Sequence, residues 1–185
     1  MFEQYNNSKA RIEEFRSFVN ECVGPIAGQI DREEHTSQEV IDILGDSGYL
    51  GAIVPVEYGG KGMDLLTYGS LIEEIGKASS AILSLFTVHG MFITALIQWG
   101  TESQKSRYLP KLASGEIIGA FALTEPKNGS DAKNLQTTAE LSGDKYVING
   151  SKKWISMGMV ADVFLTMGMV NGKPTAFIVE NDREG

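Results

Sequence analysis

The hydrophobic pattern of this 185-residue chain changes near residue 116, and the change limits the folds that the chain can adopt. Before that point, apolar residues recur at the spacing of amphipathic helices. The first such stripe consists of Ile12, Phe15, Val19, Cys22, Val23 and Ile26. After that point, short apolar runs alternate with turn residues, as in strands. Helices and strands in separate halves favour an α+β fold. We therefore predict a helical domain over residues 1–115 and a β-domain over residues 116–185.

Capping patterns mark the ends of the expected helices. Thr36-Ser37-Gln38-Glu39 and Thr101-Glu102-Ser103-Gln104 each match a capping box, in which side chains bond the first free N–H groups of a helix. Asp64 can cap another helix, and Gly115 is expected to end the helix of the second box. Residues 79–99 predict a long, largely buried helix. Its apolar part is short for a membrane span and contains polar residues, so we expect no membrane.

Turn signals separate the expected strands. Asn171-Gly172 is typical of a tight hairpin turn, and Ser142-Gly143-Asp144 offers another turn. The expected strands cover residues 117–123, 135–141, 145–148, 163–170 and 174–179. Because the last strand would leave a free sheet edge shortly before Gly185, we expect the β-domain to be incomplete.

Composition excludes several classes of function. The formal charge of −8, from 16 Lys and Arg and 24 Asp and Glu residues, is a poor match to nucleic acid. A single cysteine, Cys22, excludes an intrachain disulfide, and only two histidines are present, so we expect no metal site. The N-terminus has no basic start followed by an apolar run. We therefore expect a soluble, cytoplasmic protein.

The first segment that could hold a ligand follows an apolar strand. The run from Phe121 to Leu123 ends at the hydroxyl of Thr124, and a proline turn leads on to Gly129-Ser130-Asp131. Hydroxyls and free backbone N–H groups at the end of a strand can bind the polar edge of a ligand. A Ser- and Asp-rich turn with no binding role is the alternative.

The second segment covers residues 148–156. If it is an extended strand, its side-chain period of two puts Trp154 and Ser156 on the same face. An indole beside a hydroxyl can pack on a flat ring and hydrogen-bond the edge of that ring. An ordinary tryptophan of a core or an interface is the alternative.

Both segments belong to a series of motifs that resembles the N-terminal part of the acyl-CoA dehydrogenase family of flavoproteins. The resemblance covers nearly the whole chain and is strongest over residues 51–181. Its motifs are Pro55-x-Glu57-Tyr58-Gly59-Gly60-x-Gly62, Ile72 to Ser79, Trp99 to Lys105, Tyr108 to Glu116, Ala120 to Pro126 with Gly129-Ser130-Asp131, and Ile148 to Ser156. Any one motif is weak, but their order and spacing outweigh the alternatives given for each segment alone.

The resemblance implies a helical domain, a barrel-like middle β-domain that is only partly present, and a C-terminal helical domain that the chain lacks. It also implies FAD as cofactor. The residues that it places at FAD are Phe121, Leu123, Thr124, Gly129, Ser130, Trp154, Ile155 and Ser156. Hydrogen bonds to the polar edge of the flavin would stabilise negative charge on the reduced ring.

The reaction implied by the resemblance is the α,β-dehydrogenation of an acyl thioester. A glutamate removes the α-proton, and the β-hydride passes to N5 of the flavin. The resemblance puts that glutamate beyond Gly185, so we expect no catalytic residue in the chain, and Glu125 is expected to hold its loop. Ser130, Ser84 and Thr87 are expected to contact the substrate.

Two short sequence segments indicate whether the acyl group is carried by CoA or by a carrier protein. Thr87-Val88-His89-Gly90-Met91 is similar to dehydrogenases of natural-product pathways, some of which act on acyl groups bound to a carrier protein. Lys127-Asn128 stands where the family has small residues. The expected substrate is therefore an acyl-CoA or an acyl-carrier-protein thioester. His89 either meets a polar substrate or, as we favour, is bonded within its own helix.

Two other functions fit the same residues. Acyl-CoA oxidases and related flavin oxidases share the fold and differ in oxygen access. A shortened, non-catalytic binding module would account for an incomplete sheet and a missing base. The intact enzyme is expected to be a homo-oligomer, a dimer or a tetramer, and the sequence does not identify its electron acceptor.

Overall fold

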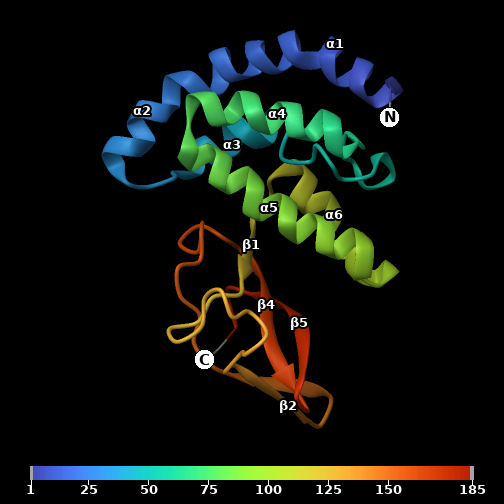
Figure 1. The fold of residues 1–185 in the computed structure, drawn as a ribbon, viewed down its shortest axis with the longest axis vertical. Coiled ribbons are helices and arrows are strands. Elements are labelled where there is room, and N and C mark those ends of the chain that lie inside the picture. The colour runs from blue at the N-terminus through green and yellow to red at the C-terminus, as the bar shows by residue number, and fades with distance from the viewer. Residues whose placement is uncertain (1, 184–185) are drawn as a thin grey trace.

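Helices form the first half of the chain and a sheet forms the second, as the change of hydrophobic pattern predicts (Figure 1). The structure is a computed structural model that describes the backbone of residues 2–183 and the side chains of residues 9–183. The α-helices are α1 (Phe2–Phe18), α2 (Gly24–Glu33), α3 (Gln38–Asp46), α4 (Leu65–Ala78), α5 (Ser80–Trp99) and α6 (Glu102–Ser114). A π-helical turn, η1 (Val19–Val23), joins α1 to α2, and a 3-10 turn, η2 (Val56–Tyr58), precedes α4.

Two of the predicted helix starts are confirmed and one is displaced. Asp64 accepts hydrogen bonds from the backbone N–H groups of Leu66 and Thr67, and Thr101 forms both bonds of its capping box. The start predicted at Thr36 is wrong by one residue. Ser37 has the extended backbone of an N-cap and accepts from the N–H of Val40, while the Thr36 hydroxyl lies against a methionine sulfur.

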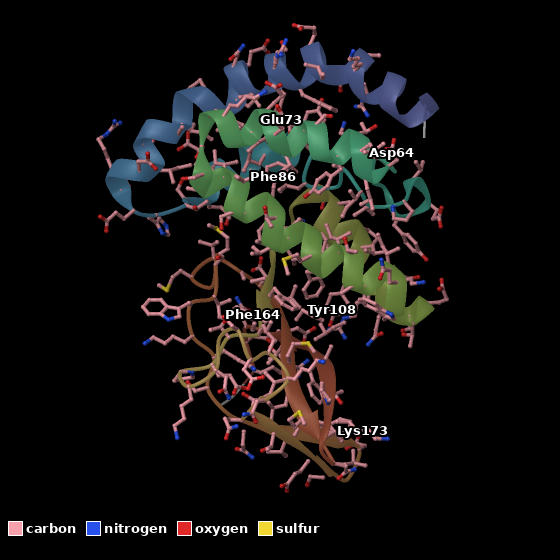
Figure 2. The ribbon with its side chains drawn as sticks, viewed as in Figure 1. Asp64, Glu73, Phe86, Tyr108, Phe164 and Lys173 are labelled. Carbon is pink, nitrogen blue, oxygen red and sulfur yellow. The ribbon has the colours of Figure 1, made fainter. Side chains whose placement is uncertain are left out.

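The helices enclose one part of the core, and the junction with the sheet encloses another. Phe86, labelled in Figure 2, belongs to the cluster inside the helical half. The second cluster joins Phe92 and Leu109 of α5 and α6 to Val163 of the sheet. Among the described residues, α5 is the one helix long and apolar enough to cross a membrane; here it packs between α4 and the first strand.

The sheet has a central strand that contacts three others. Its strands are β1 (Gly119–Ala122), β2 (Thr138–Ser142), β3 (Lys145–Asn149), β4 (Val163–Val170) and β5 (Lys173–Glu180). Strand β4 pairs with β5 in an antiparallel hairpin along one edge. Its other edge pairs in parallel with β1, and then with β2 at a single position, Thr138 opposite Met169. Strands β2 and β3 form a second antiparallel hairpin.

Both predicted hairpin turns are confirmed. Asn171 and Gly172 have φ values of 48° and 75°, as a turn with two left-handed residues requires. Gly143, between β2 and β3, also has positive φ. The fold is therefore α+β, with the helical part and the sheet in sequence order.

The extended strand expected at residues 148–156 is wrong beyond Asn149, where β3 ends. Residues 150–162 contain turns instead, and Trp154 and Met157 have φ values of 59° and 62°. Left-handed residues break the alternation of side chains along a strand. Trp154 and Ser156 therefore do not lie on one face of a strand, contrary to the prediction.

Candidate functional site

An apolar cleft of about 750 Å³ opens between α4 and α5 on one side and β1, β4 and β5 on the other. The helices contribute Tyr68, Ile72, Thr87, Gly90, Met91 and Thr94, among others, and the sheet contributes Phe121, Leu165, Met167, Pro174 and Ala176. No carboxylate of the described residues lines it. A cavity of this size and lining is suited to an extended hydrocarbon group.

The wall formed by the helices depends on a close approach of α4 to α5. The Tyr68 hydroxyl donates a 3.0 Å hydrogen bond to the carbonyl of Phe86. A Cβ at Gly90 would lie only 2.6 Å from that hydroxyl oxygen. Glycine at position 90 therefore lets the tyrosine ring lie across α5 and form part of the cleft wall.

Of the two residues of α5 predicted to contact substrate, one lines the cleft. Thr87 does so, although its hydroxyl donates to the carbonyl of Leu83 in its own helix. Ser84 is half-buried and lies outside the cleft lining. The structure thus places Thr87 where it can contact a group in the cleft, and a role for Ser84 stays a prediction.

The loop that follows β1 is organised around one buried carboxylate. Glu125 is 3% exposed, and its oxygens accept hydrogen bonds from the backbone N–H groups of Gln136 and Thr137. The ammonium of Lys152 lies 2.8 Å from Glu125 Oε1. Burial alone would raise the pKa of Glu125, but the bond from Lys152 and these backbone bonds outweigh it and lower the pKa from 4.5 to about 2. The geometry agrees with the loop-holding role predicted for Glu125, because a base needs a carboxylate with free lone pairs.

Lys152 and Lys153 join the two predicted ligand-binding segments. Lys152 Nζ donates a 3.0 Å bond to the carbonyl of Leu123, in addition to its contact with Glu125. The backbone N–H of Lys153 donates a 2.9 Å bond to the carbonyl of Thr124. Segments that are distant in sequence are therefore held side by side, and their carbonyls are already bonded inside the protein.

The side chains at the joined ends of these segments are open to a ligand. The hydroxyls of Thr124, Ser130 and Ser156 have no hydrogen-bond partner among the described side chains of residues 9–183 or the described backbone. A Cβ at Gly129 would meet nothing within 4 Å, so internal packing does not require glycine there. Trp154 is 79% exposed, whereas the neighbouring Ile155 is half-buried.

His89 lies outside the cleft lining, and it is bonded to residues of other elements instead of its own helix, so both expectations for it are wrong. The imidazole is buried on the side of α5 that faces α6 and β1. Its Nε2 lies 3.0 Å from the carbonyl of Leu112, and its Nδ1 accepts a 3.1 Å bond from the N–H of Gly119. Both partners are backbone groups, which no side-chain pattern could have revealed.

The site also contains residues that sequence reasoning missed. Leu165 and Met167 of β4 and Pro174 and Ala176 of β5 line the cleft, and Tyr68 forms part of its other wall. Apolar residues in a predicted strand indicate a buried face but not what that face covers. Lys152 could have been identified from the sequence, because it lies in the family motif from Ile148 to Ser156.

Family models match both halves of the chain. The model of the acyl-CoA dehydrogenase N-terminal domain matches residues 6–116, and that of the acyl-CoA dehydrogenase middle domain matches residues 120–185. The chain belongs to the acyl-CoA dehydrogenase family. The predicted resemblance is thereby confirmed over nearly the whole chain.

Two curated relatives of this chain are about twice its length. It is 39% identical over 176 residues to an acyl-CoA dehydrogenase of Bacillus subtilis (strain 168), and 41% identical over 176 residues to a short-chain-specific acyl-CoA dehydrogenase of Clostridium acetobutylicum. Each alignment covers 92% of this chain and 46% of the relative. The chain therefore spans about half the length of these relatives.

Solved structures share the same fold. An acyl-CoA dehydrogenase from Geobacillus kaustophilus matches with a TM-score of 0.88 at 28% identity, and butyryl-CoA dehydrogenase from Megasphaera elsdenii with 0.86 at 32%. Both matches cover 95% of this chain and 48% of the solved chain.

Proposed function

We propose that this protein catalyses the flavin-dependent α,β-dehydrogenation of an acyl-CoA thioester and that the chain supplies the acyl cleft and one side of the flavin site. The observation that carries the proposal is the course of β1. Phe121 on this strand lines the apolar cleft, and the strand leads directly to Thr124, where the two ligand-binding segments are held together. The cleft wall and the first free hydroxyl are thus three residues apart on one segment.

FAD is the cofactor that fits these residues. Support comes from related solved structures, since the acyl-CoA dehydrogenase of Bacillus anthracis was solved in complex with FAD and matches with a TM-score of 0.85 at 35% identity. On this chain, the exposed indole of Trp154 is a flat apolar surface, and Thr124 and Ser156 offer hydroxyl donors. When bound, FAD supplies an acceptor for the hydride that leaves the β-carbon.

The chain's own residues then have separate tasks. The apolar walls of the cleft, including Phe121 and Leu165, exclude water from the acyl chain. Thr124 and Ser156 would hold the polar edge of a bound flavin through their hydroxyl donors, which would favour its reduction. The Glu125–Lys152 pair holds the segments that carry these donors.

We propose that the base comes from a part of the protein outside the described residues. The cleft lining has no carboxylate among the described side chains of residues 9–183, and the oxygens of Glu125 are bonded to Lys152 and to backbone N–H groups. A general base must reach the proton that it removes and must have a free lone pair.

Removal of the hydroxyl donors tests the flavin site. In the complete protein, Thr124→Ala and Ser156→Ala should each weaken FAD retention or lower the flavin potential. A lost hydrogen bond is worth about 1 kcal/mol, and more where it serves developing charge. Ser151→Ala is a matched control on the same segment. Wild-type FAD occupancy, potential and turnover in both variants would contradict the assignment.

CoA is the thioester carrier that we propose, because the named relatives act on CoA esters and the cleft offers mainly apolar contacts. The burial of His89 also removes one reason for a polar acyl group. A side-by-side assay of matched acyl-CoA and acyl-carrier-protein substrates decides the carrier. A higher kcat/KM on the carrier-bound substrate would contradict CoA as the carrier and favour a carrier protein. A separate test concerns the electron acceptor: rapid aerobic reoxidation of the reduced flavin would identify an oxidase.

A further inference from the structure

His89 occupies the joint between the two family domains. It lies on α5, which belongs to the helical domain, and it bonds Gly119, the first residue of β1. Its other bond reaches Leu112, near the end of α6. One side chain therefore connects three elements, two of which are separated only by the short link from Ser114 to Gly119.

The partners fix the protonation state of the ring. Gly119 offers an N–H, so Nδ1 must accept and cannot carry a proton. Leu112 offers a carbonyl, so Nε2 must carry the proton and donate it. The ring is thus a neutral imidazole of defined tautomer with both nitrogens bonded. Its pKa is lowered from 6.5 to about 4 by burial, against the opposing effect of the Leu112 bond.

The hydrogen bonds that join His89 to Leu112 and Gly119, called the His89 bridge below, lie beside the cleft. Gly90 and Met91, the residues that follow His89, line the cleft from the helix side. Phe121, two residues after Gly119, lines it from the sheet side. A Cβ at Gly119 would lie 2.9 Å from the ring of Phe92, so β1 begins in direct contact with α5. A small shift of β1 at this point changes the separation of the two cleft walls.

We propose that His89 is a positioning residue: by bonding Leu112 and Gly119 at once, it holds β1 against α5 and so sets the width of the acyl cleft. The role rests on the proposed function, since the cleft is taken as the acyl site. His89 would thus affect the proposed reaction from a buried position outside the cleft lining. Its loss should act on the fit of the acyl chain more than on the chemical step.

Two variants separate the bridge from ordinary packing. His89→Gln can still offer one acceptor and one donor, whereas His89→Leu removes both. Ile82→Ala is the control, because Ile82 is buried on the same helix and lies outside the cleft lining. The assay is kcat and KM of the FAD-loaded, complete protein on straight-chain acyl-CoA substrates of increasing length.

We expect His89→Leu to raise KM about tenfold for the best substrate and to change the preferred chain length, with a smaller effect on kcat. His89→Gln should stay within about threefold of the wild type, and Ile82→Ala should keep the wild-type order of chain lengths. A chain-length order in His89→Leu that matches the control would overturn the role.

Amide hydrogen exchange distinguishes failure of this inference from failure of the proposed function. Protection at Gly119 and Phe121 should fall in His89→Leu and persist in His89→Gln, whether or not acyl-CoA is turned over. Unchanged protection in His89→Leu overturns the bridge. An inactive wild type with the expected exchange pattern overturns the proposed function and leaves the bridge in place. Nitrogen NMR of His89 gives a check that needs no variant, because a protonated Nδ1 would also refute the bridge.

Discussion

Replacement of Lys152 by methionine should destabilise the β-domain strongly, because it leaves the Glu125 carboxylate buried without its cation. The Glu125 side chain is 1% exposed and that of Lys152 is 11% exposed, so water cannot take over the role of the ammonium. The carboxylate would keep two backbone N–H donors. Lys152→Met would also free the carbonyl of Leu123, which loses its 3.0 Å bond.

The size of the effect follows from the pair itself. Lowering the pKa of Glu125 from 4.5 to about 2 corresponds to about 3 kcal/mol that favours the ionised form in the folded state. This contribution is fully present above pH 4.5 and is lost as the pH falls towards 2. Removal of one partner of a buried pair costs about 3–5 kcal/mol, because the remaining charge is uncompensated. We therefore expect Lys152→Met to lower the free energy of unfolding by about 3 kcal/mol at neutral pH.

Urea unfolding of the complete protein at pH 7, with and without FAD, measures the effect. Lys153→Met is the matched control, since Lys153 is the exposed neighbour and its ammonium lies over the Trp154 ring at 4.5 Å. It should cost less than about 1 kcal/mol. The double variant Glu125→Gln/Lys152→Met should be more stable than the two single losses added together predict. A Lys152→Met variant as stable as Lys153→Met would refute the reasoning.

Two further predictions concern α5. The neutral His89 of the folded state has a pKa of about 4, whereas the unfolded imidazole binds a proton near pH 6.5. Stability should thus be complete above pH 6.5 and fall by up to about 3 kcal/mol towards pH 4, and unfolding of His89→Gln across this range should lack that part of the slope. Gly90→Ala should cost about 1–3 kcal/mol, since its Cβ would displace the Tyr68 hydroxyl from the carbonyl of Phe86. Gly69→Ala, where a Cβ meets nothing within 4 Å, should instead stabilise α4 by up to about 1 kcal/mol; equal melting temperatures for the two alanine variants would contradict this explanation.

Elements encoded by local chemistry were predictable from the sequence. The Asn171-Gly172 turn, the Thr101 capping box and the Asp64 cap depend on residues a few positions apart, and all three are confirmed. The Thr36 start failed for an equally local reason. Thr36 and Ser37 both offer a hydroxyl, and the pattern cannot say which of them has the extended backbone of the cap.

The site was predictable only where a motif existed. The family motifs identified Thr124 and the segment that holds Trp154, but the alternation rule gave the wrong geometry, because Trp154 and Met157 adopt left-handed backbone angles. His89 shows the deeper limit. Its partners are the carbonyl of Leu112 and the N–H of Gly119, and every residue except proline has both groups. Only the path of the chain decides which of them a buried imidazole meets.

The parallel pairing of β1 with β4 has a consequence for the order in which the chain folds. The bond from the Ile118 N–H to Asp162, beside the first pair of that ladder, spans 44 residues. Helix contacts form locally and quickly, whereas a parallel pair this far apart must first overcome the entropy of closing a long loop. Until β4 arrives, Phe92 and Leu96 of α5, a helix as apolar as a membrane span, lack the cluster that they form with Val163 and Leu165 of β4. We therefore expect soluble yield during synthesis to depend on how fast β4 pairs, and we expect substitutions that slow this step to promote aggregation even where the finished fold is as stable as before.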